Sequence, residues 1–199
     1  MKRALRHLTQ VDPVLGGVIE RVGPYRLKPM REGTHFDHIA RAIVYQQLSW
    51  RAAQTIYGRI VDHFGGRPPP KAILKAAPEA LRACGLSRQK LGYLLDMAEK
   101  AVSGAVPFET LHELGDEEVI AALRRVKGVG VWTAQMFLIF RLGRPDVLPI
   151  TDLGIQKAVQ RAYRLRKLPT PERVAKVGAP WRPFASVASW YLWRSLDAP

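Results

Sequence analysis

The sequence is poor in the residues and segments that mark secreted, membrane-spanning and metal-cluster proteins. Its single cysteine, Cys84, cannot form an internal disulfide or supply a four-cysteine zinc site or an iron–sulfur cluster. No apolar run of signal-peptide length follows the basic N-terminus, and no stretch of about 18 uninterrupted apolar residues occurs. The five histidines show no metal-ligand spacing. We therefore expect an intracellular protein that is neither secreted nor anchored by a membrane span, and we expect no metal site.

Acidic residues are also scarce. The 199 residues include 31 Lys and Arg against 17 Asp and Glu, which gives a formal net charge of +14 at pH 7 and a pI near 10.4. Hydrophobic residues make up 47% of the chain, so one or two small domains with real cores are expected rather than a disordered polycation. A polyanion is the natural partner of such a chain, although charge alone does not identify it.

Apolar residues recur at helical spacing, and alternation of the β type is almost absent, so we predict an all-α protein. Thr34, Ser49 and Asp116 are placed to cap helices, and glycines follow several of the apolar segments. Residues 1–33 are assigned no element. The predicted helices cover residues 35–46, 50–64, 71–76, 78–83, 87–103, 117–126, 131–142, 151–167, 171–177 and 181–196.

The most informative stretch is a predicted helical hairpin at residues 123–134, with the sequence LRRVKGVGVWTA. Gly128 and Gly130 permit positive φ and a close approach of another backbone, and the helix that follows presents unpaired N–H groups. Arg124, Arg125 and Lys127 add positive charge beside this turn. The pattern suits a phosphodiester, but an ordinary helix–helix turn with a glycine cap would give a similar sequence.

About twenty residues further on, Asp152 begins another predicted helix in the sequence LPITDLGI at 148–155. An aspartate here is often only an N-cap. A carboxylate at a helix N-terminus is ionised at pH 7, so it can also stabilise a developing cation, although it would be a poor proton donor. Cleavage of an N-glycosidic bond requires such a group, because the sugar passes through an oxocarbenium-like state.

Together these stretches resemble the helix–hairpin–helix DNA glycosylase superfamily, and most closely its 3-methyladenine DNA glycosylase II, or AlkA-like, branch. The likeness covers nearly the whole chain, from about residue 12 to residue 193. The order of hairpin, aspartate loop and C-terminal Trp-Arg-Pro segment is more specific than any one motif. Further matching segments are HFD at 35–37, RAIVYQQLS at 41–49, RPDVLP at 144–149, WRPF at 181–184 and WYLW at 190–193.

The resemblance implies a two-lobed helical fold with a DNA cleft between the lobes. One lobe would span residues 34–150 and the other residues 1–33 and 151–199, and the short stretch before Thr34 leaves no room for the extra N-terminal β domain of larger relatives. Asp152 would lie at the cleft. The residues expected to grip the DNA backbone are Lys127, Gly128, Val129, Gly130 and Thr133.

Base flipping is also implied, because the glycosidic bond of a stacked base cannot be reached. Gln47 lies where the superfamily places the residue that fills the vacated stack. A register slip of one position would transfer this role to Gln46 or Leu48, and a polar helix end facing water is the plain alternative. Arg161 and Arg164 belong to a basic helix face that is either solvated or in contact with DNA.

Trp132 occupies the position of the lysine that forms a Schiff base in bifunctional members. Since tryptophan is no nucleophile, the resemblance implies a monofunctional enzyme that uses water. Trp132 and Trp190 would line a base pocket whose ring faces favour cationic alkylated purines, with core packing as the alternative for each. The other expected pocket residues are Tyr45, Met136 and Leu153. Met136 and Leu153 stand at positions that are often aromatic in this branch, which leaves pocket size open.

The expected function is excision of alkylated purines such as 3-methyladenine and 7-methylguanine from double-stranded DNA, with Asp152 as the catalytic carboxylate. The alternatives are a glycosylase for neutral bases such as hypoxanthine or uracil, and a DNA-binding module without catalysis. No cofactor is expected, apart from an optional monovalent cation on hairpin carbonyls. We expect a cytoplasmic, nucleoid-associated monomer.

Overall fold

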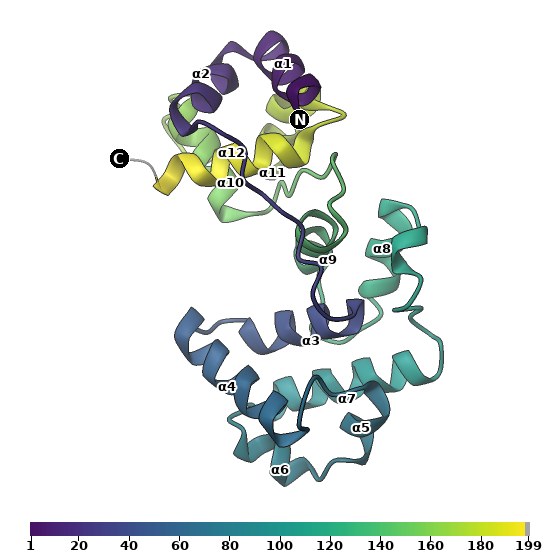
Figure 1. The fold of residues 1–199 in the computed structure, drawn as a ribbon. Coiled ribbons are helices and arrows are strands. Elements are labelled where there is room, and N and C mark those ends of the chain that lie inside the picture. Colours follow the sequence, from purple (N-terminus) through teal and green to yellow (C-terminus); the bar gives the residue numbers. More distant parts are fainter. Residues whose placement is uncertain (198–199) are drawn as a thin grey trace. The chain divides into compact units, whose positions relative to one another are not determined.

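The computed structural model describes residues 1–197, which contain helices and no strand (Figure 1). This confirms the predicted all-α class. None of the described helices is both long and apolar enough to cross a membrane. The α-helices are α1 (Lys2–Val11), α2 (Pro13–Val22), α3 (His35–Tyr45), α4 (Trp50–His63), α5 (Pro70–Lys75), α6 (Pro78–Ala83), α7 (Arg88–Val102), α8 (Asp116–Leu123), α9 (Val131–Phe137), α10 (Leu153–Ala162), α11 (Pro171–Gly178) and α12 (Ala185–Asp197).

The chain divides into two compact units. The terminal unit combines residues 1–29 with the chain from residue 138 onward, and the central unit spans residues 30–137. These junctions precede the predicted lobe boundaries at 34 and 151. The second junction precedes residue 151 because residues 145–147 are hydrogen-bonded to the start of α12. Ser186 N donates to Pro145 O at 2.9 Å, and Val147 N donates to Ser186 Oγ at 2.9 Å.

The core of the terminal unit is built from α1, α2, α10 and α12. Helix α12 packs against both α2 and α10, and α1 packs against α2. The apolar faces of these helices meet around Trp181 and Tyr191, both of which are fully buried. The sequence pattern predicted no element within residues 1–33, so α1 and α2 are additions to the predicted fold. The core side chains that they contribute include Ala4, Leu8, Leu15 and Val18.

In the central unit, α7 packs against α3, α5 and α6, and α3 also contacts α4 and α9. Thr34 caps α3 through a capping box with Asp37, and Ser49 caps α4 by accepting a hydrogen bond from Ala52 N. Both caps are as predicted. Gly115, not Asp116, precedes α8, and its N–H donates to the Glu118 carboxylate at 2.8 Å. Asp116 instead begins the helix, where its charge favours the positive end of the dipole.

Several predicted helices are shorter in the structure, for local reasons. The predicted helix 131–142 is α-helical only to Phe137 and continues as a π-helical turn, Leu138–Leu142, before Gly143 takes a φ of 69°. The predicted helix 151–167 ends at Ala162, since Arg164 adopts a φ of 53° and Leu165 N bonds back to Gln160 O. The last helix begins at Ala185 rather than 181, after Pro183, which cannot donate a helical hydrogen bond.

Candidate functional site

Asp152 is the N-cap of α10, and its carboxylate is held from two sides. Oδ1 accepts a hydrogen bond from Ile155 N at 2.8 Å and a second one from the Trp193 indole Nε1 at 2.8 Å. The capping role expected from the sequence is therefore present, and a side chain from α12 is added to it. Because two donors fix one carboxylate oxygen at a half-buried helix start, the negative charge has a defined position in the terminal unit.

Trp193 was not among the predicted site residues. Its indole stacks on Phe140 with ring centroids 5.6 Å apart and an interplanar angle of 28°. Gly154 lies close to Trp193 and Asp152, since a Cβ there would be 3.0 Å from both Trp193 Cδ1 and Asp152 Oδ1. The glycine of the TDLG segment thus lets the indole and the carboxylate meet. The sequence signal was the WYLW segment, where two tryptophans lie three residues apart on one helix.

Trp190, one of the two indoles predicted for the base pocket, is part of the core of the terminal unit. It is buried against Tyr25, with ring centroids 4.7 Å apart, and against Tyr191, with centroids 4.8 Å apart. For Trp190 the core-packing alternative describes the observed position. A role of Trp190 in a base pocket stays a prediction, and of the two tryptophans on α12 it is Trp193 that donates to Asp152.

The other predicted pocket residues belong to different units. Leu153 follows Asp152 and is 53% exposed. Trp132 and Met136 lie one turn apart on α9 in the central unit, where Trp132 is 46% exposed, and Tyr45 ends α3 in the same unit. Each of these side chains has an accessible part, as a ligand-binding role requires. Assembly of one base pocket from these residues stays a prediction.

Side chains of α7 contact the hairpin between α8 and α9. Gly128 takes a φ of 78°, and a Cβ at this position would lie 2.2 Å from Tyr93 Cδ2, so glycine is required both by the backbone and by the close aromatic ring. Gly130 faces open space, since a Cβ added to it would have no neighbouring atom within 4 Å. Val129 and Thr133 are buried and serve packing, in contrast to the exposed Lys127 side chain.

Asp96 on α7 anchors the hairpin electrostatically. Its Oδ2 accepts from Lys127 N at 2.8 Å, and its Oδ1 lies 2.5 Å from Lys100 Nζ and 3.6 Å from Lys127 Nζ. Burial raises the pKa of this carboxyl, but the hydrogen bonds and charges of Lys100 and Lys127 outweigh it and lower the pKa below its ordinary value. The hairpin backbone is therefore fixed by a charged partner that remains ionised well below neutral pH.

The turn at residues 46–48 is tied to the hairpin and to α7. Gln46 Nε2 donates to Gly128 O at 2.8 Å, while Lys90 Nζ donates to Val44 O at 2.7 Å and to Gln46 O at 2.6 Å. Burial lowers the pKa of the Lys90 ammonium. Gln47 takes a φ of 54°, and its side chain and that of Leu48 are exposed. Of the three candidates for filling a base stack, Gln46 is thus engaged within the protein, and Gln47 and Leu48 point to solvent.

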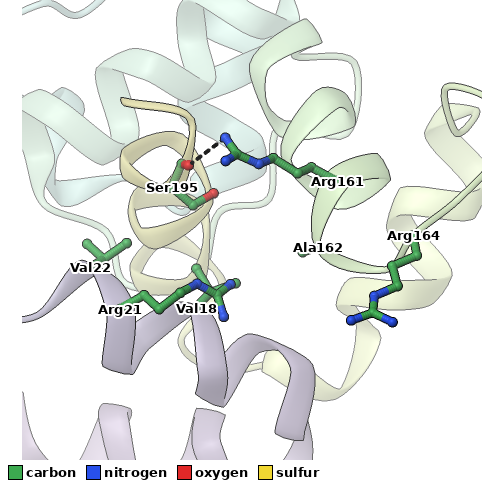
Figure 2. Close-up of a pocket in the computed structure, with 7 residues that line it drawn as sticks. All are labelled: Val18, Arg21, Val22, Arg161, Ala162, Arg164 and Ser195. Carbon is green, nitrogen blue, oxygen red and sulfur yellow. Dashed lines mark hydrogen bonds between the residues drawn. The ribbon is translucent and has the colours of Figure 1, made fainter. Parts of the chain in front are cut away.

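A separate basic pocket lies at the other end of α10 from Asp152 (Figure 2). Arg21, Arg161 and Arg164 line this cavity of about 620 Å³ together with Val18 and other residues. Arg161 Nη1 donates to Ser195 O at 3.4 Å, near the C-terminus of α12. Cations at helix C-termini offset the negative end of the helix dipole. Arg161 and Arg164 lie at the C-terminal end of α10, and Arg161 also reaches the end of α12, so a structural role explains their positions.

Proteins of known family resemble this chain along most of its length. Residues 40–183 match the family model described as HhH-GPD superfamily base excision DNA repair protein. The chain is 36% identical over 199 residues to DNA-3-methyladenine glycosylase 1 of Schizosaccharomyces pombe, covering 98% of this chain and 87% of that protein. It is 31% identical over 169 residues to the putative DNA-3-methyladenine glycosylase YfjP of Bacillus subtilis, covering 81% of this chain and 59% of that protein.

Solved structures of 3-methyladenine glycosylases also resemble this chain. A Schizosaccharomyces pombe 3-methyladenine DNA glycosylase in complex with abasic DNA superposes with a TM-score of 0.86 at 37% identity, covering 96% of this chain and 95% of that one. A DNA-3-methyladenine glycosidase from Bacillus halodurans has a TM-score of 0.86 at 33% identity, covering 98% and 94%. The chain therefore belongs to the HhH-GPD superfamily of base excision DNA repair proteins, in its 3-methyladenine glycosylase branch.

Proposed function

We propose that this protein is a monofunctional DNA N-glycosylase that removes alkylated purines and leaves an abasic site, with Asp152 as its catalytic carboxylate. The observation that carries the proposal is the Asp152 carboxylate, fixed by Ile155 N and Trp193 Nε1, in a chain that resembles 3-methyladenine glycosylases along nearly its whole length. The partner is double-stranded DNA, which agrees with the charge of +14. We further propose that the protein acts as a cytoplasmic, nucleoid-associated monomer.

The chemistry follows from the charge of the leaving base. In 3-methyladenine and 7-methylguanine the base carries a positive charge, so the electron pair of the C1′–N bond neutralises the base as it departs. The sugar is left as an oxocarbenium-like cation, which the Asp152 carboxylate stabilises. Water then adds to C1′ and loses a proton, which completes the hydrolysis. No general acid is required for a base that leaves already charged.

The residue at position 132 argues for hydrolysis without strand cleavage. A lyase step needs an amine that forms a Schiff base with the sugar, and Trp132 stands at the position where bifunctional relatives carry that lysine. The exposed indole instead offers a ring face, which attracts a cationic purine. In this proposal Trp132 therefore accounts both for the preference for cationic purines and for the absence of a lyase step.

A monovalent cation on the hairpin is compatible with the proposal but is not used in it. Gly128 O accepts from Gln46, and Val126 O accepts from Val129 N at 3.1 Å. Each carbonyl keeps a second lone pair that could face a cation, which would then add positive charge for a DNA phosphate. All steps described above depend on the protein's own groups and on water.

The first experiment measures release of free base from duplexes that contain 3-methyladenine, 7-methylguanine or hypoxanthine. We expect faster single-turnover release of the methylated purines than of hypoxanthine at about pH 7 to 8, and a relative gain for hypoxanthine as the pH falls toward about 5.5, because solution acid assists a neutral leaving group. A rate ratio that does not change with pH would reveal a general acid in the protein. Release of no base, with DNA binding intact, would mean a binding module without catalysis.

The hairpin provides a second prediction. Gly128→Ala should weaken binding to all duplexes by about tenfold or more, because the methyl group meets the Tyr93 ring and the backbone is held at positive φ. Gly58→Ala is the matched control and should bind normally, since it adds a methyl group on α4, outside the hairpin, where a Cβ would have no neighbouring atom within 4 Å. Gly130→Asp should again weaken binding to every sequence by placing a negative charge against the phosphate. Normal affinity of Gly128→Ala and Gly130→Asp at low salt, with circular dichroism unchanged, would place the hairpin away from DNA.

A further inference from the structure

Trp50 is an exposed aromatic residue that the proposed mechanism does not use. Its exposed fraction of 63% is the largest among the large hydrophobic side chains of residues 1–197. It is the first residue of α4, and it follows directly on the Ser49 cap. A tryptophan so placed exposes a large apolar ring to water, which has a cost unless the ring is covered by a ligand.

The indole is held in place by a cation and by neighbouring rings. Its centroid is 5.2 Å from that of Tyr45 in an edge arrangement, and the Arg41 guanidinium lies 5.3 Å from the Trp50 centroid and 4.8 Å from that of Tyr45. Tyr45 in turn contacts Tyr57 at 6.4 Å. Because Trp50 remains 63% exposed beside these contacts, much of its surface is available for stacking.

The position of Trp50 connects it to the turn whose residues Gln47 and Leu48 are predicted candidates for filling the base stack. Gln47 and the 40% exposed Leu48 form the turn that leads into α4. Lys90 and the Gln46 contact with Gly128 fix this turn to α7 and to the hairpin. The aromatic ring, the stack-filling turn and the hairpin are therefore parts of one connected surface within the central unit.

We propose that Trp50 is a stacking platform for the nucleobase that loses its partner when the damaged base leaves the duplex. This inference rests on the proposed function. An orphaned base has an exposed ring face, and aromatic side chains bind such faces without regard to sequence. Arg41, beneath the indole, and the exposed Arg51 supply positive charge for the adjoining phosphates.

The test compares two duplexes that carry the same stable abasic-site analogue. In the first, a normal pyrimidine stands opposite the analogue, and in the second the opposite position also lacks its base. We expect Trp50→Ala to bind the first duplex roughly 5- to 100-fold more weakly than the parent and the second within about twofold, because only the first contains a base to stack. Trp50→Phe should recover most of the affinity for the first duplex.

The matched control is Val102→Ala, which removes another exposed apolar side chain, 47% exposed, from the same unit and should change neither affinity. Equal losses of Trp50→Ala on both duplexes would assign the indole to the DNA backbone, and unchanged affinity on both would exclude a DNA contact. Either result overturns the stacking proposal while leaving excision by the parent intact. Failure of the parent itself to bind abasic DNA and to release methylated purines would overturn both proposals.

Discussion

Replacing Asp152 with asparagine is expected to lower the single-turnover excision rate of a methylated purine by roughly 10³-fold. Asparagine retains an Oδ1 that can accept from Ile155 N and from Trp193 Nε1, so the start of α10 should keep its geometry. What is lost is the negative charge that stabilises the sugar cation. The measurement is base release under enzyme excess at neutral pH, with the parent and the variant on identical duplexes.

Binding and stability separate this loss from a folding defect. The asparagine variant should bind abasic-site DNA within about tenfold of the parent, and its thermal midpoint should change little, since both hydrogen bonds persist. Asp152→Ala is the useful comparison, because it removes the cap as well and should lower stability by about 1 kcal/mol. Near-parental excision by Asp152→Asn would show that the carboxylate is a helix cap and that the catalytic group lies elsewhere.

The hairpin and Asp152 could be located from the sequence because their signals are local. The pattern of two glycines between apolar helices, and that of an aspartate before a helical segment, can each be recognised from neighbours within a few residues. The caps at Thr34 and Ser49 could be predicted for the same reason, and the structure confirms both. Local chemistry of this kind determines where elements begin, so the helix starts beside both motifs can be predicted without tertiary contacts.

The partners of these motifs come from distant parts of the chain and leave no local signal. Trp193 meets Asp152 from 41 positions away, and the neighbouring Trp190 has the same residue type and a similar apolar setting. Lys90 and Asp96 are ordinary polar residues of α7 in the sequence, yet they hold the turn after α3 and the hairpin. Packing decides such roles, and helical periodicity alone does not distinguish them.

The end of α10 shows a second kind of limit. Helices often stop at a glycine in the left-handed region, and several of the predicted helix ends depend on this rule. Here Arg164 adopts that conformation instead, so the predicted helix continued to residue 167 although it ends at Ala162. A non-glycine residue at positive φ is imposed by the surrounding fold, which the sequence pattern does not display.

Asp12→Ala should produce the largest loss of stability, about 3 to 5 kcal/mol, because it leaves several buried donors unsatisfied. Oδ1 of this buried carboxylate caps α2 by accepting from Leu15 N at 3.0 Å. Oδ2 accepts from Trp181 Nε1 at 2.8 Å and from the Tyr163 hydroxyl. One side chain thus joins α2 to the end of α10 and to the buried Trp181 in the terminal unit.

Urea unfolding followed by circular dichroism measures the effect as a shift of the midpoint at constant slope. Asp12→Asn should lose less, about 1 to 3 kcal/mol, since its oxygen still accepts one bond while its NH₂ group faces other donors. Glu20→Ala, which removes a carboxylate from α2 outside the buried cluster, is the control and should stay within about 0.5 kcal/mol of the parent. A loss below about 1 kcal/mol for Asp12→Ala would show that water satisfies these donors.

The Asp12 carboxylate and the Tyr163 hydroxyl also affect how the free energy of unfolding changes at alkaline pH. Burial raises the pKa of Tyr163 well above its ordinary value of 10, and the hydrogen bond to Asp12 and the Asp12 charge raise it further. Above pH 10 the unfolded chain loses this proton while the folded chain retains it, so the stability that is fully present below pH 10 declines as the pH rises. Tyr25, whose pKa burial and Tyr191 raise to about 12, acts in the same sense. Tyr163→Phe removes this ionisable group and leaves that of Tyr25, so its free energy of unfolding should fall less steeply between about pH 9 and 11 than that of the parent. Parallel pH profiles of the two proteins would mean that the pKa of Tyr163 is not raised in the folded state.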